Sequence, residues 1–109
     1  MKMVALLVCV FSSFSSLAGY NANFSGRITH VLTYTYTPLI LIRLEGQPSS
    51  HPVCGSLDYL AIDGNTPDSI RMQVLSRVMT AYTTGEVINI GYDKEGDCVG
   101  SRIRVHRVG

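Results

Sequence analysis

The chain has 109 residues, a formal net charge of +1 at pH 7 and 46% hydrophobic residues. This length fits a single domain, and the sequence shows no linker, repeat or low-complexity tract that would divide it. Only 16% of the residues are charged and neither sign dominates, so the composition argues against a nucleic-acid-binding protein.

Residues 1–18 have the layout of a secretory signal peptide. Lys2 gives a positive start, residues 3–11 form an apolar run, and Ala18 precedes Gly19. The apolar run is shorter than the roughly 20 residues that span a bilayer. We therefore expect cleavage after Ala18, a secreted or periplasmic protein, and a single mature domain of residues 19–109 without a membrane span.

Removal of this segment would change both the charge and the cysteine count. Lys2 is the one charged residue that would be lost, so eight basic residues would face eight acidic ones. Cys54 and Cys98 would remain, and an even cysteine count in a short exported chain predicts a disulfide. Such a bridge would contribute ~3–4 kcal/mol to stability. Two free buried thiols are the alternative, which an oxidising compartment disfavours.

Strand patterns surround one helical pattern along the chain. Residues 26–37 alternate in polarity with Thr and Tyr enrichment, which predicts a half-buried strand that Pro38 ends. Further strands are predicted at residues 39–44, 57–62, 86–92 and 101–108. Five strands with a helix between the third and the fourth favour a mainly β, Greek-key OB-fold barrel. An open α+β sheet is the competing architecture.

The predicted helix begins after a cap at Asn65 or Thr66, places Pro67 at its first position, and ends at Thr84 before Gly85. Its apolar sector is close to twice the width of about 100° that is usual for a surface helix. A small domain cannot cover so wide a sector by itself, so we expect a homo-oligomer. The apolar flank that we expect between subunits consists of Met72, Leu75, Met79 and Tyr82.

No catalytic or metal-binding pattern emerges from the polar residues. His30, His51 and His106 fall in different predicted elements, and the sequence shows no nucleophile elbow, zinc-ligand spacing or phosphate loop. A calcium loop starting at Asp93 would need glycine and glutamate where Cys98 and Arg104 stand. We therefore expect no enzyme activity, no metal and no cofactor.

Two patterns remain as candidate binding surfaces. Arg102, Arg104 and His106 share one face of the last predicted strand, where contact with solvent or with an acidic partner subunit is expected rather than with nucleic acid. The Tyr and Thr residues of "LTYTYTP" are typical of a sugar-binding surface, because aromatic rings stack on sugars. Strand propensity explains the same residues equally well.

Two short motifs carry a family resemblance. "NFSGRIT" in the first strand and "AYTTGEVINIGYD" between the helix and the fourth strand resemble the B subunits of the subtilase cytotoxin and typhoid toxin group. The resemblance implies an exported OB-fold that forms a homopentamer, binds sialylated glycans of host cell surfaces and accompanies a toxin A subunit. The matching order covers residues 24–92, whereas the cysteine layout and the loop at residues 45–55 depart from the family.

The resemblance also implies particular glycan-binding residues. Ser25 stands in the place of the family serine that holds the carboxylate of sialic acid, and Tyr92 matches a tyrosine that borders the same pocket. Asn21 lies where the family has a polar contact upstream of the serine. A secreted or periplasmic protein-interaction or inhibitor module, with the same fold and without sugar binding, is the alternative. The Ser-Gly pair would then be an ordinary turn.

Overall fold

The computed structural model describes residues 19–109 as a mainly β fold with a seven-stranded sheet and one helix. The expected signal peptide lies outside the described residues. None of the helical structure in residues 19–109 is long and apolar enough to cross a membrane. The elements are β1 (Ala22–Thr33), β2 (Ile40–Leu44), β3 (Ser56–Ile62), α1 (Asp68–Thr84), β4 (Val87–Tyr92), β5 (Cys98–Val99), β6 (Arg102–Arg104) and β7 (Arg107–Val108).

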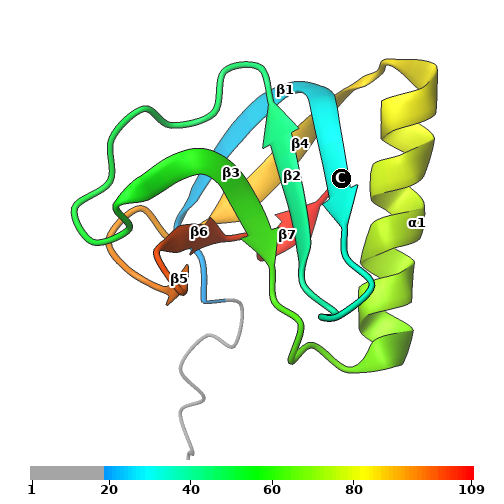
Figure 1. Cartoon of the computed structure of the whole chain (residues 1–109). Helices are drawn as coiled ribbons and strands as arrows, with labels where there is room; N and C mark the ends of the chain where they lie inside the picture. Colours follow the sequence, from blue (N-terminus) through cyan, green and yellow to red (C-terminus); the bar gives the residue numbers. More distant parts are fainter. Residues whose placement is uncertain (1–18) are drawn as a thin grey trace, which may run out of the picture.

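The sheet is open and has the strand order β5-β6-β3-β2-β1-β4-β7. Strand β1 is long enough to pair with β4 along its first half and with β2 along its second half. Neighbouring strands are antiparallel except β3 and β6, which are parallel. Figure 1 shows α1 standing along one side of the curved sheet, while the connection between β2 and β3 extends on the opposite side.

The core lies between the inner face of the sheet and α1. Alternating residues of the strands supply its aliphatic side chains, while the helix contributes Val78 and Ala81, which are fully buried. This arrangement uses only one side of the helix. The fully buried large side chains come from four strands and the helix: Ile42, Leu60, Ile90, Ile103 and Val78.

The predicted helix and the position of its end are confirmed. Gly85 ends α1 in the left-handed conformation, with φ of 71°, and donates its N–H to Ala81 at 2.9 Å. The predicted start is wrong, because Pro67 itself occupies the N-cap and no side chain caps the helix. Asp68, the first helical residue, supplies the acidic charge that favours a helix start.

The prediction of five strands is wrong, although the helix does lie between β3 and β4. The segment predicted as one strand at residues 101–108 changes partner midway: β6 pairs with β3, and β7 pairs with β4. This change breaks the strand at Val105 and His106. A further short strand, β5, pairs with β6 where the chain turns back after Cys98.

The first strand is also displaced from its predicted range of 26–37. Pairing with β4 extends β1 back to Ala22, so the "NFSG" motif lies inside the strand and not before it. At the other end β1 stops at Thr33, because the chain already bends at residues 35 and 36 before it reaches Pro38. Ser25 is therefore a strand residue.

Candidate functional site

Ser25 lies on the outer face of the β1–β4 pair. Residues opposite one another in an antiparallel pair point to the same face, and successive residues alternate between faces. Phe24 and Ile90 face the core, so Ser25 and its partner Asn89 face outward. The Ser25 side chain is exposed as a result.

The hydroxyl of Ser25 belongs to a short chain of polar side chains across three strands. Asn89 of β4 donates from Nδ2 to Ser25 Oγ at 3.0 Å. Arg107 of β7 donates from Nη1 to Asn89 Oδ1 at 3.1 Å. The outer face of β1, β4 and β7 therefore carries a hydroxyl, an amide and a guanidinium group in sequence, a set that suits polar or anionic ligands.

Tyr92 and Asn21 do not join Ser25 in this arrangement. Tyr92 pairs with Ala22 and shares the core-facing side, where its ring meets the edge of Phe24 with centroids 6.0 Å apart. Asn21 lies beside the turn after β4, where Oδ1 accepts from the N–H of Lys94 at 3.0 Å and Nδ2 donates to Glu95 at 3.2 Å. Asn21 thus holds a turn, and Tyr92 packs against the core.

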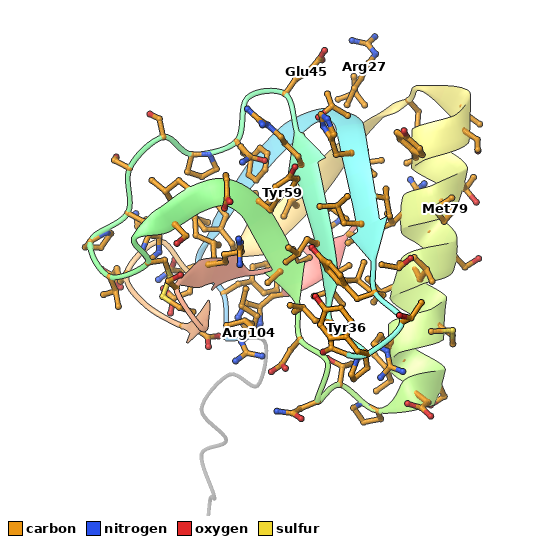
Figure 2. The ribbon with its side chains drawn as sticks, in the orientation of Figure 1. Arg27, Tyr36, Glu45, Tyr59, Met79 and Arg104 are labelled. Atoms are coloured by element: carbon orange, nitrogen blue, oxygen red, sulfur yellow. A yellow bond between two sulfur atoms is a disulfide. The ribbon has the colours of Figure 1, made fainter. Side chains whose placement is uncertain are left out.

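The turn after β2 passes close to the backbone of Ser25 and Gly26. The turn at Glu45 and Gly46 crosses β1 so closely that a Cβ on Gly26 would lie 1.9 Å from the carbonyl oxygen of Glu45. A Cβ on Gly46 would lie 3.5 Å from the carbonyl oxygen of Ser25. Figure 2 shows Glu45 at the same end of the molecule as Arg27, two residues after Ser25.

A groove of about 620 Å³ runs along the connection between β2 and β3, and this turn forms part of its wall, whereas Ser25 does not line it. Gln47 fixes its shape, because Oε1 accepts from the N–H of Leu44 at 2.9 Å while Nε2 donates to the carbonyls of Leu57 and Asp58, both at 3.0 Å. Its walls combine hydroxyl, charged and apolar groups, which suits a sugar. They include Thr29, His30, Arg43, Glu45, Pro48 and Ser49.

Asn89, Arg107 and Glu45 are the residues of this region that sequence reasoning missed. The alternation of residues 87–92 indicates that Asn89 faces outward, but only the register of β1 against β4 places it opposite Ser25. Arg107 was hidden by the break between β6 and β7. Glu45 was hidden because a loop sequence does not reveal which strand the loop crosses.

A second cavity, of about 440 Å³, lies between α1 and the C-terminal segment. One wall is an ion-pair network in which Arg104 bridges Asp63 and Asp97, and His106 also contacts Asp97. The hydrogen bond from the Asn65 N–H, followed by that from Arg104, lowers the pKa of Asp63. Burial raises the pKa of Asp97, but hydrogen bonds from Arg104 and His106 outweigh it, so the net shift is downward. These charges satisfy one another and stabilise the fold.

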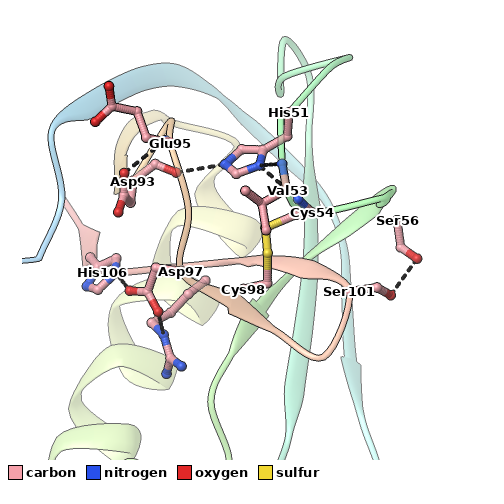
Figure 3. The surroundings of a disulfide bond; sticks show 11 residues. His51, Val53, Cys54, Ser56, Asp93, Glu95, Asp97, Cys98, Ser101 and His106 are labelled. Carbon is pink, nitrogen blue, oxygen red and sulfur yellow. Dashed lines mark hydrogen bonds and ion pairs between the residues drawn. A yellow bond between two sulfur atoms is a disulfide. The ribbon is translucent and has the colours of Figure 1, made fainter.

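The predicted disulfide between Cys54 and Cys98 is confirmed, with 5.7 Å between the Cα atoms. His51 lies beside it and has both ring nitrogens engaged (Figure 3). Nδ1 accepts from the N–H of Cys54 at 2.9 Å, and Nε2 donates to the carbonyl of Asp93 at 2.8 Å. His51, Cys54 and Cys98 are close enough to suggest a metal site, but the disulfide uses both sulfurs. His51 is a structural residue that joins two loops.

The flank of α1 formed by Met72, Leu75, Met79 and Tyr82 is open to solvent in the isolated chain. Met72, Met79 and Tyr82 are 48%, 40% and 42% exposed, while Leu75 is half-buried. The turn after β1 adds Tyr36, which is 83% exposed and packs against Tyr34 with ring centroids 5.6 Å apart. Large apolar groups therefore gather on the helix and on the adjacent turn (Figure 2).

No protein-family model, no curated protein and no solved structure matches this chain.

Proposed function

We propose that this protein is an exported, non-catalytic subunit that binds sialylated glycans, similar in role to the B subunits of subtilase cytotoxin and typhoid toxin. One observation carries the proposal: the Ser25 hydroxyl is exposed on the outer face of the sheet, bonded to Asn89 and through it linked to Arg107. A hydroxyl, an amide and a guanidinium group on one face are suited to a carboxylate-bearing sugar.

The proposed architecture is an OB-type barrel. Two features support it: the parallel pairing of β3 with β6, and the C-terminal segment that pairs first with β3 and then with β4. That segment links the two ends of the strand order. Val105 donates its N–H to the carbonyl of Ala61 at 2.8 Å, and His106 donates to that of Gly91 at 2.8 Å. A partly open Greek-key barrel is the form expected of an OB-fold.

The proposed assembly is a homopentamer in which the flank of Met72, Leu75, Met79 and Tyr82 lies between subunits. Its support is the exposure of Met72, Met79 and Tyr82 in the isolated chain. A ring would also suit sugar binding, because single sites for sugars are weak. Presenting several copies on a cell surface commonly raises avidity by ~10²–10⁴-fold. A catalytic A subunit would be the second partner.

An interaction or inhibitor module without sugar binding is the second candidate function. The observation in its favour is the exposure of Tyr36, Met72 and Met79, together with a hollow in which Met72 of α1 adjoins Tyr34 of the turn after β1. Aromatic and methionine side chains are enriched at protein interfaces. This candidate assigns the apolar side to a different protein, whereas the glycan-binding proposal assigns the helix flank to copies of this chain.

The experiment that separates the two candidates is binding of the purified protein to an array of sialylated glycans and their desialylated counterparts. We expect binding to the sialylated members and its loss after sialidase treatment of the same array. Equal signals on both sets, or no signal on either, would contradict the proposed function and favour the interaction module.

A further inference from the structure

The side-chain amide of Asn89 determines whether the Ser25 hydroxyl donates or accepts a hydrogen bond on the side that faces Asn89. Its side-chain amide lies between two partners, with Nδ2 at 3.0 Å from Ser25 Oγ and Oδ1 at 3.1 Å from Arg107 Nη1. The two ends of an amide have opposite hydrogen-bonding character, because the nitrogen donates and the oxygen accepts. The orientation of this amide therefore fixes what each partner is able to do.

Arg107 sets that orientation. A guanidinium group only donates hydrogen bonds, so it selects the amide oxygen as its neighbour and turns the nitrogen toward Ser25. The reversed amide would place N–H groups of Asn89 against N–H groups of Arg107. Ser25 Oγ is consequently an acceptor toward Asn89, and its single hydroxyl proton points elsewhere.

We propose that Asn89 and Arg107 are positioning residues that make the Ser25 hydroxyl a hydrogen-bond donor to the ligand. Ser25 is exposed on the outer face of β1, so its free proton is directed to an acceptor outside the protein. The ligand atom at Ser25 is then an acceptor, such as a carboxylate oxygen, and not a donating sugar hydroxyl. The identity of the ligand rests on the proposed function, whereas the direction of the proton does not.

Neutron diffraction from crystals of the ligand-free protein tests the direction of the proton, because deuterium atoms are visible by this method. We expect a deuteron of Asn89 between Nδ2 and Ser25 Oγ, and the Ser25 deuteron directed away from Asn89. A Ser25 deuteron on the line toward Asn89 overturns the proposal, whatever the protein binds.

Sugar binding tests whether the ligand atom at Ser25 is a carboxylate oxygen. The probes are the α-methyl glycoside of N-acetylneuraminic acid and its carboxyl-reduced alcohol. Arg107→Met removes the group that fixes the orientation of the Asn89 amide. Asn89→Asp replaces the donating amide nitrogen with an acceptor, so the Ser25 hydroxyl donates to residue 89 and not to the ligand. Both should weaken binding of the carboxylate probe by roughly tenfold to a hundredfold, the equivalent of one hydrogen bond to a charged group. The alcohol probe should lose much less.

Two matched variants separate positioning from charge. Arg107→Lys retains a donor for Asn89 Oδ1 and should keep most of the affinity. Arg27→Met removes an equal charge from the same face of the sheet, where Arg27 donates to the carbonyl of Gly85 at 2.9 Å, and should also keep it. Equal losses for Arg27→Met and Arg107→Met would overturn the positioning role. If the wild-type protein binds neither probe while the deuterons lie as expected, the proposed function and the ligand assigned here both fail.

Discussion

Gly26 is required by the turn that crosses it. Because its hypothetical Cβ would lie 1.9 Å from the Glu45 carbonyl oxygen, no side chain fits without moving backbone. The glycine of "NFSG" therefore serves close packing between β1 and the turn after β2. The serine beside it has its side chain on the outer face.

Gly26→Ala should destabilise the fold by about 1–3 kcal/mol, since overpacking against backbone is not relieved by rotating a side chain. Chemical denaturation of the purified protein measures this loss. Gly55→Ala is the matched control, because a Cβ at Gly55 meets nothing within 4 Å. Equal stability of the two variants would contradict the close approach.

His51 stabilises the fold through hydrogen bonds made by both of its ring nitrogens. Replacing it with phenylalanine keeps a ring of similar shape but leaves the Cys54 N–H and the Asp93 carbonyl without their partner. We expect a loss of about 1–3 kcal/mol from the unpaired groups, measured by the midpoint of urea unfolding. An unchanged midpoint would show that water replaces the imidazole at no cost.

At the scale of elements, the C-terminal segment carries the ion pairs that hold the lower end of the sheet together. Figure 2 shows Arg104 at the end opposite Glu45. Arg104 bridges Asp63, at the end of β3, to Asp97, which adopts a positive φ of 63° in the turn before β5. This contact secures the approach to α1 and the turn next to the disulfide.

The lowered pKa values of Asp63 and Asp97 predict a loss of stability in acid. Because the folded pKa of each lies below its unfolded value, their stabilisation is complete above the unfolded pKa of about 3.9 and is lost as the pH falls through the folded values. Melting temperatures measured from pH 6 to pH 2 should therefore decrease in the acidic part of the range. Arg104→Met should make this decrease shallower while lowering stability at pH 6.

Arg102→Met is the matched control for that series, because Arg102 pairs with the single, more exposed carboxylate of Asp58 at 3.1 Å. Its effect on stability at pH 6 should be smaller, since exposed ion pairs contribute little. A pH profile of Arg104→Met parallel to that of the wild type would contradict the network's role.

Some elements of the fold could be located from the sequence alone. The strands predicted at residues 57–62 and 86–92 and the glycine after Thr84 placed β3, β4 and the end of α1 within a residue, because local chemistry determines them. The displaced start of β1 and the break at Val105 depend on which strands become neighbours. Pairing across the chain is not encoded in the local pattern, so Asn89 and Arg107 were identified only from the fold.

At the scale of the whole molecule, one side of the helix has no covering partner in the described chain. Met79→Glu places a charge in the middle of the flank of Met72, Leu75, Met79 and Tyr82. If this flank lies between subunits, the variant should dissociate to monomers at concentrations where the wild-type protein is oligomeric, because a buried unpaired charge is costly. Light scattering coupled to size-exclusion chromatography measures the mass of both.

Gln73→Glu introduces the same charge on the opposite flank of α1, where Gln73 is exposed, and should leave the oligomer intact. A monomeric wild-type protein at micromolar concentration would contradict the assembly and shift the exposed apolar side toward a different protein partner.

Whether Ser25 holds a sugar carboxylate, as we propose, is tested most directly by the affinity of Ser25→Ala for a sialylated glycan, measured alongside its melting temperature. The variant should lose roughly tenfold to a hundredfold in affinity per site, because a hydrogen bond to a charged group contributes ~1.5–3 kcal/mol. Melting should change little, since Ser25 is exposed. Ser76→Ala on the exposed side of α1 should leave the affinity unchanged. Unchanged affinity of Ser25→Ala, or the absence of any glycan binding by the wild-type protein, would contradict the claim.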